Sequence, residues 1–321
     1  MKHLKKVVFF GTHASAVASL EALEELGLVP ELIVSRPEAG IRPLDGFDEQ
    51  EEHHEVVEWA RARDIPRVRS RRAMEDSLHE RIAQIEPDLL VVSDFGRPLP
   101  MELVTRAERG AIGIHPSTLP KYRGAHAVRA LIADGYNRIG STAYLVDEEP
   151  WAGDIVVQEE DSLGKKETYR LVMPRVLKIT KDVTTQAIKK MDRKKGLPKG
   201  RRQNHRIATK TPRMGKRYRK VPWSMDAEGV FNRMRAFTPG GLHCHCNRRP
   251  VKIWSGIPLG WEKYTSGEIG TYLGMRQGKL AVLCADDTVF GVVKLQRPGH
   301  DPESASSFAQ REMLRVGDRF V

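Results

Sequence analysis

Short apolar runs alternate with helix-like stretches along the first half of this chain, and this alternation constrains the fold more than any other feature. Residues 5–10, KKVVFF, form an apolar run that stops at Gly11, and residues 14–26 follow with apolar side chains at near-helical spacing. Similar strand-like runs occur at residues 31–35 and 87–96. Strands that alternate with helices predict an α/β domain whose parallel sheet is covered by helices on both faces.

The second half of the chain has a different pattern. Residues 222–237 form a helix-like segment that stops at TPGG, and short strand-like runs separated by turn residues follow to the end. This pattern predicts a small β-rich domain, most simply a barrel. We therefore expect an N-terminal domain over residues 1–195, a connection over residues 196–221 and a C-terminal domain over residues 222–321.

Positive charge is concentrated in one part of the sequence. Residues 161–220 contain 21 Lys and Arg against 4 Asp and Glu, whereas residues 1–160 contain 19 against 28. A local basic stripe is typical of a surface that binds a polyanion, although a solvated connection without a ligand would have the same composition. The cations that we expect to contact such a polyanion are Arg201, Arg202, Arg206, Lys210, Arg213 and Lys216.

Several other classes of protein lose support from the composition. No apolar run approaches the roughly 20 residues that a bilayer span needs, and the amino terminus lacks the apolar core of a secretory signal. The chain contains three cysteines, which favours a reducing cytoplasm over a disulfide framework. Neither a G-x-G-x-x-G nor a P-loop pattern is present, so dinucleotide-binding and P-loop functions are not indicated. We expect a cytoplasmic monomer that contacts neither membrane nor DNA.

A single histidine stands at the end of a strand-like run in residues 111–124, AIGIHPSTLPKYRG. His115 is followed by Pro116, which has no N–H to continue a strand ladder. Asp94 likewise stands at the end of an earlier strand-like run, residues 87–96. Ligands of parallel sheets gather at the carboxyl ends of strands, so both residues are candidates for a binding site. The alternative is a core histidine whose ring nitrogens are bonded to the backbone.

The HCHC segment at residues 243–246 has the residue types of a zinc site. Its residues lie in a strand-like pattern, where alternate side chains face opposite sides, so the four cannot converge easily on one ion. We therefore predict no metal.

The segment GIHPSTLPKYRGAHAVRALIADG, followed by GSTAYLV and AGDIVVQ, resembles the folate-dependent formyltransferases, and specifically the methionyl-tRNA formyltransferase family. The loop motif of that family runs N-x-H-x-S-L-L-P-x-[YFW]-R-G. Four further segments resemble the family in order along the chain: VVFFGTHASAVASLEAL, VPWSMDAEGVFNRMRAF, PVKIWSG and LAVLCADDTVFGVVKLQRPG. The resemblance implies a Rossmann-like formyltransferase domain with a parallel-rich sheet, followed by an OB-like barrel.

The resemblance also implies an enzyme that moves a formyl group from 10-formyltetrahydrofolate to the amino group of methionyl initiator tRNA. Such a reaction needs a base for the amine proton and a donor for the developing oxyanion. In the family an asparagine polarises the formyl oxygen, a histidine takes part in proton transfer and an aspartate supports the histidine. Here His115 matches the histidine, but Gly113 occupies the asparagine position and Trp151 the aspartate position.

These two departures leave three hypotheses open. The family reaction persists with substitutes, or the site uses another donor, or the chain is a formyltransferase-like paralogue that binds RNA or a ribonucleoprotein without catalysis. The Gly113 N–H is one substitute donor, and the polar side chains that could substitute are Asp94, Asp147, Asp154 and His126. The residues that we expect to line the folate pocket are Ser117, Thr118, Leu119, Pro120 and Phe95.

The acceptor is the least constrained part of this hypothesis. The basic stripe suits tRNA, because phosphate contacts dominate affinity for nucleic acid. The segment KYRGAHA, with His126, is similar to a motif of some amino-sugar formyltransferases, which makes a small-molecule acceptor the third option. The loop at residues 36–52 is a second argument against a tRNA acceptor, because acidic side chains in its second half would repel phosphate. These side chains are Asp45, Asp48, Glu49, Glu51 and Glu52.

Overall fold

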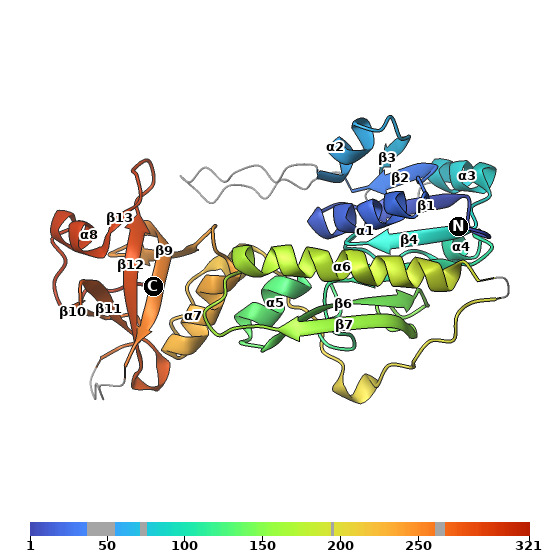
Figure 1. Cartoon of the computed structure of the whole chain (residues 1–321). Coiled ribbons are helices and arrows are strands. Elements are labelled where there is room, and N and C mark those ends of the chain that lie inside the picture. The colour runs from blue at the N-terminus through green and yellow to red at the C-terminus, as the bar shows by residue number, and fades with distance from the viewer. Residues whose placement is uncertain (37–54, 71–75, 194–195, 261–266) are drawn as a thin grey trace.

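The computed structural model describes the chain in five stretches, which are residues 1–36, 55–70, 76–193, 196–260 and 267–321. These residues form an α/β part and a β-rich part that lie side by side (Figure 1). Among them, no helix is both long and apolar enough to cross a bilayer.

A seven-stranded sheet forms the centre of the first part, in the order β3-β2-β1-β4-β5-β6-β7. The first five strands are parallel, as the alternating pattern predicts. β6 is antiparallel to β5, and β7 is antiparallel to β6, so β7 again runs in the direction of the first five strands. The strands are β1 (Val7–Gly11), β2 (Leu32–Ser35), β3 (Arg67–Arg69), β4 (Leu89–Ser93), β5 (Ala111–His115), β6 (Arg138–Leu145) and β7 (Ile155–Ser162).

Helices cover both faces of this sheet because successive strand residues point to opposite sides. Phe9 packs into one core with α1, α2 and α6, and Phe10 packs into another with α3 and α4. The segment after β5 forms α5, which ends before Gly135 as expected. The helices of this part are α1 (Ala14–Glu25), α2 (Glu55–Arg61), α3 (Asp76–Ile85), α4 (Met101–Val104), α5 (Ala127–Ala133) and α6 (Tyr169–Met191).

The second part is an antiparallel sheet with the strand order β10-β11-β12-β9-β8, and β13 pairs with β12. The last residues close it: Asp318 accepts from the Tyr272 N–H of β10 at 2.8 Å, and Val321 accepts from the His245 N–H of β8 at 2.6 Å. The predicted barrel is therefore present. Its elements are α7 (Ala227–Ala236), β8 (Leu242–Cys246), β9 (Arg249–Leu259), β10 (Tyr272–Arg276), β11 (Lys279–Leu283), β12 (Val289–Gln296), β13 (Glu303–Ser304) and α8 (Ala305–Arg311).

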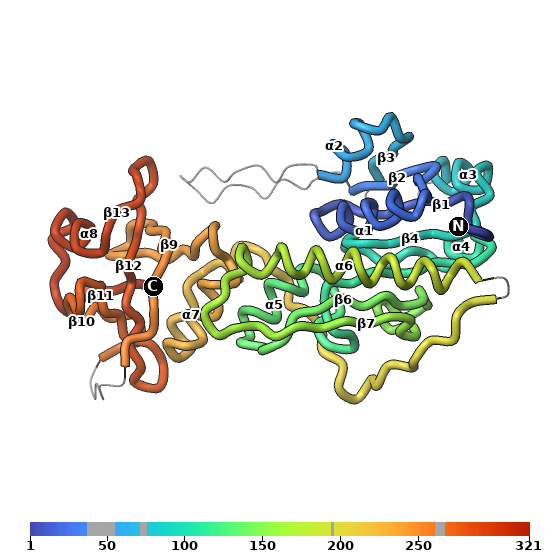
Figure 2. Tube along the Cα trace, viewed as in Figure 1, coloured from blue at the N-terminus to red at the C-terminus, as the bar shows by residue number. Residues whose placement is uncertain are grey.

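The two parts meet where α5 packs against α7, and side chains from both helices share one apolar core. Residues 196–221 run between the parts as an extended connection with two short 3-10 turns, η1 (His205–Ile207) and η2 (Lys216–Arg219). Figure 2 shows this segment passing along the lower side of the first part before it reaches α7. We refer to residues 196–221 as the linker.

Candidate functional site

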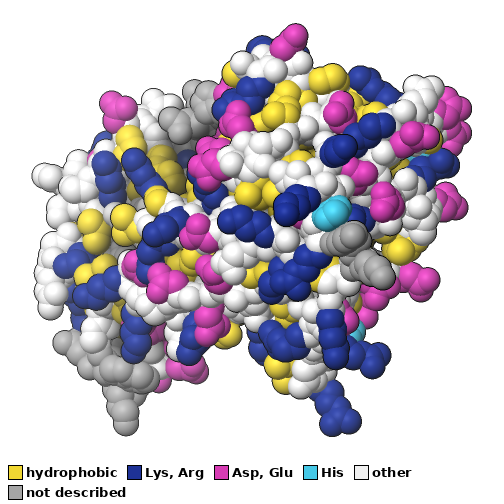
Figure 3. Space-filling view, turned by 45° about the vertical axis from the view of Figure 1, so that its right-hand side comes forward, with side chains coloured by type: hydrophobic (Ala, Val, Ile, Leu, Met, Phe, Trp, Pro, Cys, Tyr) yellow, Lys and Arg dark blue, Asp and Glu magenta, His cyan; other side chains and the backbone are white. Residues whose placement is uncertain are grey.

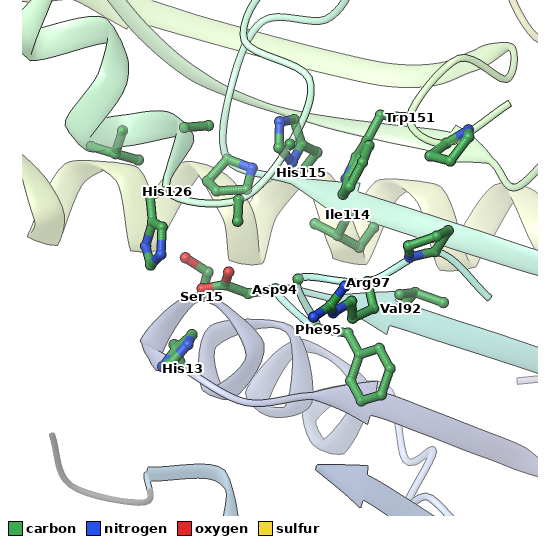
Figure 4. Close-up of a pocket in the computed structure, with 18 of the residues that line it drawn as sticks. His13, Ser15, Val92, Asp94, Phe95, Arg97, Ile114, His115, His126 and Trp151 are labelled. Atoms are coloured by element: carbon green, nitrogen blue, oxygen red, sulfur yellow. The ribbon is translucent and has the colours of Figure 1, made fainter. Parts of the chain in front are cut away.

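A cavity of about 220 Å³ opens at the carboxyl ends of β4 and β5, where the sequence places the site. Its walls come from both of these strand ends, from the start of α1, from α5 and α6, and from the turn before β7. Figure 4 shows His115 and Trp151 on one side of the cavity, with Asp94, Ser15 and His13 on the other. Side chains far apart in the sequence therefore converge on one space.

His115 ends β5 and is 4% exposed. Its Nε2 lies 2.9 Å from the Tyr122 carbonyl oxygen, and because a carbonyl only accepts, Nε2 carries the hydrogen. Nδ1 then has a lone pair, and no partner for it occurs among the described residues. Burial lowers the pKa of His115 to about 4, against opposing contributions from the Tyr122 carbonyl and the Asp94 charge. The imidazole is therefore neutral at pH 7 and able to accept a proton.

The space beside Gly113 is filled by a tyrosine. Gly113 pairs with Tyr144 across β5 and β6, so both residues face the same side of the sheet as His115. A Cβ on Gly113 would lie 2.3 Å from Tyr144 Cζ, 2.4 Å from Cε1 and 2.6 Å from Oη. Tyr144 therefore requires glycine at position 113, because the tyrosine occupies the space that a larger side chain at this position would need.

Trp151 lines the cavity next to His115. The two ring centroids are 6.3 Å apart and the ring planes are tilted by 50°. The backbone at Trp151 has a φ of +61°, and its carbonyl accepts from Gln203 Nε2 at 3.0 Å. The indole covers His115 on one side, but the cavity remains open, so the indole does not fill the cleft.

The polar candidates for a substitute role separate into two groups. Asp94, Asp147 and His126 line the cavity together with His115, and the charge on Asp94 raises the pKa of the imidazole. Asp154 lies beside Gly200 and is not among the residues that line the cavity. In Figure 4 the His126 side chain points from the start of α5 toward Asp94. Asp94 is thus the candidate carboxylate in the cavity whose charge favours the protonated form of His115.

The segment expected to line a folate pocket, residues 117–120, lies outside the lining of this cavity. Ser117 is buried and donates to the Lys121 carbonyl at 2.8 Å, and the Leu119 N–H donates to Thr142 Oγ1 at 3.1 Å. None of Ser117, Thr118, Leu119 and Pro120 is among the described residues that line the cavity, although Pro116 and Phe95 are. Two of these side chains are used elsewhere: the Ser117 hydroxyl bonds within its own loop, and Leu119 packs with Tyr144 and Ile155.

The linker is bonded to both loops that flank His115. Arg123 N–H donates to the Thr209 carbonyl at 2.8 Å and Tyr122 N–H donates to Thr209 Oγ1 at 2.8 Å. Gln203 Nε2 donates to the Gly153 and Trp151 carbonyls, at 2.8 and 3.0 Å. The linker therefore fixes the loop whose Tyr122 carbonyl orients the His115 ring.

The basic side chains of the linker point outward. Lys and Arg side chains gather at the lower edge of the molecule in Figure 3, where Figure 1 places the linker. The six cations predicted to contact RNA are all exposed, namely Arg201, Arg202, Arg206, Lys210, Arg213 and Lys216. The acidic loop side chains at Asp45, Asp48, Glu49, Glu51 and Glu52 lie outside the described residues.

Alternate side chains of the HCHC strand face opposite sides, as strand geometry requires. Cys244 and Cys246 are buried in the barrel, whereas His245 is exposed on its outside. The described residues contain no cluster of three or more His, Cys, Asp and Glu side chains that could bind an ion.

Two residues near His115 were not identified from the sequence, Tyr144 and Gln203. The β5–β6 register that places Tyr144 over Gly113 is a long-range pairing, and no local pattern indicates it. Gln203 lies inside a basic run whose composition conceals its buried role.

Comparison with known proteins identifies relatives over nearly the whole chain. Residues 5–188 match the formyl transferase family, and residues 213–312 match the formyl transferase C-terminal domain. The methionyl-tRNA formyltransferase of Anaeromyxobacter dehalogenans is 29% identical over 316 residues, which cover 97% of this chain and 99% of that protein.

Solved structures share the fold at lower identity. A sugar 3N-formyl transferase, WlaRD, crystallised with dTDP and 5-N-formyl-THF, matches with a TM-score of 0.63 at 16% identity, over 93% of this chain and 100% of its own. HypX from Aquifex aeolicus matches with a TM-score of 0.58 at 16% identity, over 98% of this chain. The chain spans about half of HypX, 48% of its length.

Proposed function

Since this chain belongs to the formyl transferase family, we propose that it transfers the formyl group of 10-formyltetrahydrofolate to the amino group of methionyl initiator tRNA, the modification that prepares this tRNA for translation initiation. The end-to-end match to relatives named methionyl-tRNA formyltransferase supports the acceptor class. The observation that carries the proposal is the position of the linker. The linker presents an exposed cationic surface and is hydrogen-bonded to the loop at Tyr122 and Arg123, which orients His115. Among the described residues, His115 is the only histidine that ends a strand of the central sheet.

The cavity offers a suitable space for the donor. Phe95, Leu99 and Trp151 supply apolar surface, while Asp94 and Arg97 supply polar groups at the rim. A flat heteroaromatic ring with polar edges matches a pocket that combines apolar walls with a few polar groups. When bound there, the folate supplies the activated formyl group, and the protein supplies position and proton transfer.

His115 is the proposed proton acceptor. As the amine attacks the formyl carbon, its nitrogen must lose a proton, and the neutral imidazole can take that proton at Nδ1. The imidazolium formed is stabilised by the negative charge of Asp94, which favours the protonated ring. The proton is then available for the tetrahydrofolate nitrogen that leaves when the carbon–nitrogen bond of the donor breaks.

The linker is the proposed site of acceptor binding. Phosphate contacts by Lys and Arg supply most of the affinity for nucleic acid and place the substrate without reading its bases. Lys210 follows Thr209, whose backbone and side chain bond to the loop at Tyr122 and Arg123. A tRNA bound along this surface therefore reaches the entrance of the cavity from one side.

A formyl-transfer assay on two acceptors tests this proposal. Wild-type protein is incubated with 10-formyltetrahydrofolate and either methionyl initiator tRNA or a nucleotide-linked amino sugar, and formylated product is quantified. We expect turnover of the tRNA and at least 100-fold less with the sugar. Tight tRNA binding without turnover would establish the non-catalytic RNA-binding alternative, and turnover of the sugar alone would establish the small-molecule one.

A further inference from the structure

The hydroxyl of Tyr144 is a hydrogen-bond donor that has no role in formyl transfer as described so far. Tyr144 lies on β6 in register with Gly113, two residues before His115, and its ring ends above the Gly113 Cα. It lines the cavity, and no hydrogen-bond partner for its hydroxyl occurs within the described part of the chain. The hydroxyl oxygen is not one of the described buried atoms that lack a partner, so it reaches the surface of the cavity, where a ligand atom can accept its hydrogen bond.

Formyl transfer to an amine requires such a donor. The formyl oxygen gains negative charge in the tetrahedral intermediate, and a preorganised donor aimed at that charge is often the largest single contribution to the rate. Three of the other donors in the cavity are placed differently. Arg129 stacks on Tyr169 at 3.8 Å and donates to the Ala236 carbonyl, Arg97 is exposed, and Ser15 lies across the cavity beside Asp94 (Figure 4).

We propose that the phenolic hydroxyl of Tyr144 donates a hydrogen bond to the formyl oxygen and stabilises the oxyanion of the intermediate, with Gly113 serving to leave room for the ring. This inference rests on the proposed formyl transfer and names a catalytic residue for it. No covalent bond to Tyr144 forms or breaks, and the hydroxyl proton stays on the tyrosine throughout the reaction.

Packing makes Tyr144 a well-positioned donor. Its ring is buried in a small apolar cluster with Leu119 and Ile155, which restricts it to one orientation. Burial also raises the pKa of Tyr144, so the hydroxyl remains protonated, and therefore able to donate, through neutral and mildly alkaline pH.

The first test is Tyr144→Phe, which removes only the hydroxyl. We expect kcat for formylation to fall about 100- to 1,000-fold, the usual effect of removing one oxyanion donor, while the folate Kd stays within about 3-fold. Tyr272→Phe is the matched control, because Tyr272 is equally buried but lies on β10 of the barrel, and its kcat should equal that of wild type. A Tyr144→Phe enzyme with kcat within about 3-fold of wild type overturns the inference.

A second pair of variants tests whether position 113 and Tyr144 share one role. Tyr144→Ala vacates the space beside Gly113, and adding Gly113→Asn should place an amide donor in that space. We expect the double variant to be at least 10-fold more active than Tyr144→Ala alone. An equal or lower kcat, with both variants folded by circular dichroism, contradicts the shared role. If wild type itself does not formylate any acceptor, the proposed function fails instead, which separates the two outcomes.

Discussion

The contact between Gly113 and Tyr144 makes a strong prediction about stability. In Gly113→Ala the added Cβ would be placed 2.3 to 2.6 Å from two ring carbons and the hydroxyl oxygen of Tyr144, well inside normal contact distance. The ring cannot retreat freely, because it is buried against Leu119 and Ile155. Inserting one methyl group into such a tightly packed core costs about 1–3 kcal/mol.

Thermal unfolding followed by near-ultraviolet circular dichroism measures this cost. A loss of 1 kcal/mol lowers the midpoint by roughly 2–4 °C in a domain of about this size, so we expect a fall of about 2–12 °C for the first unfolding transition. Gly215→Ala is the matched control, because no heavy atom lies within 4 Å of its added Cβ and its φ of −82° suits alanine. That control should unfold within about 1 °C of wild type.

The same substitution in a Tyr144→Ala background identifies the cause of the effect. Without the ring, the alanine at position 113 has space, so the additional fall in the midpoint should vanish. Two residues in direct contact are expected to show this non-additivity. If Gly113→Ala has no effect in wild type, or lowers the midpoint equally in both backgrounds, the steric reasoning is refuted.

Four further predictions follow from His115 and the linker. Titration of the His115 ring by NMR should give a pKa of about 4, and a midpoint near 6.5 would contradict the buried neutral imidazole. Between pH 6.5 and 4 the unfolded chain binds a proton at His115 and the folded chain does not. The free energy of unfolding, measured with urea, should therefore fall by on the order of 3 kcal/mol as pH falls through this range. Arg206→Ala with Lys210→Ala should reduce the slope of log affinity for tRNA against log salt by about two, whereas one cation away from the linker, Arg106→Ala, should leave tRNA affinity unchanged. Gln203→Ala leaves the Trp151 and Gly153 carbonyls without this donor, so it should lower the unfolding midpoint and kcat together, and an unaltered kcat would show that the linker does not support the site.

The sequence predicts the framework of the site because the framework depends on local patterns. Apolar runs that stop at Gly11 and at Asp94 place strand ends at one edge of a parallel sheet, and His115 follows from the same logic. Gly135 likewise ends α5 where the sequence indicates. These features need only the preferences of neighbouring residues.

The chemistry around His115 depends on pairings between distant segments, and these leave no local signal. The antiparallel register of β6 brings Tyr144 to Gly113, so the position that appears empty in the sequence is occupied in space. The linker appears as a solvated basic run, yet its Gln203 and Thr209 bond to the loops of the cavity. Ser117 has the residue type of a binding loop, but its hydroxyl is used by a backbone carbonyl.

Proton transfer by His115 is the central claim, and single-turnover formylation by His115→Ala tests it most directly. With methionyl initiator tRNA and 10-formyltetrahydrofolate in excess over their dissociation constants, the rate should fall by about 100- to 10,000-fold, the range that a general base contributes. The tRNA affinity should stay within a few-fold of wild type, because the cationic linker is unchanged. A His115→Ala protein that formylates at the wild-type rate would contradict the account.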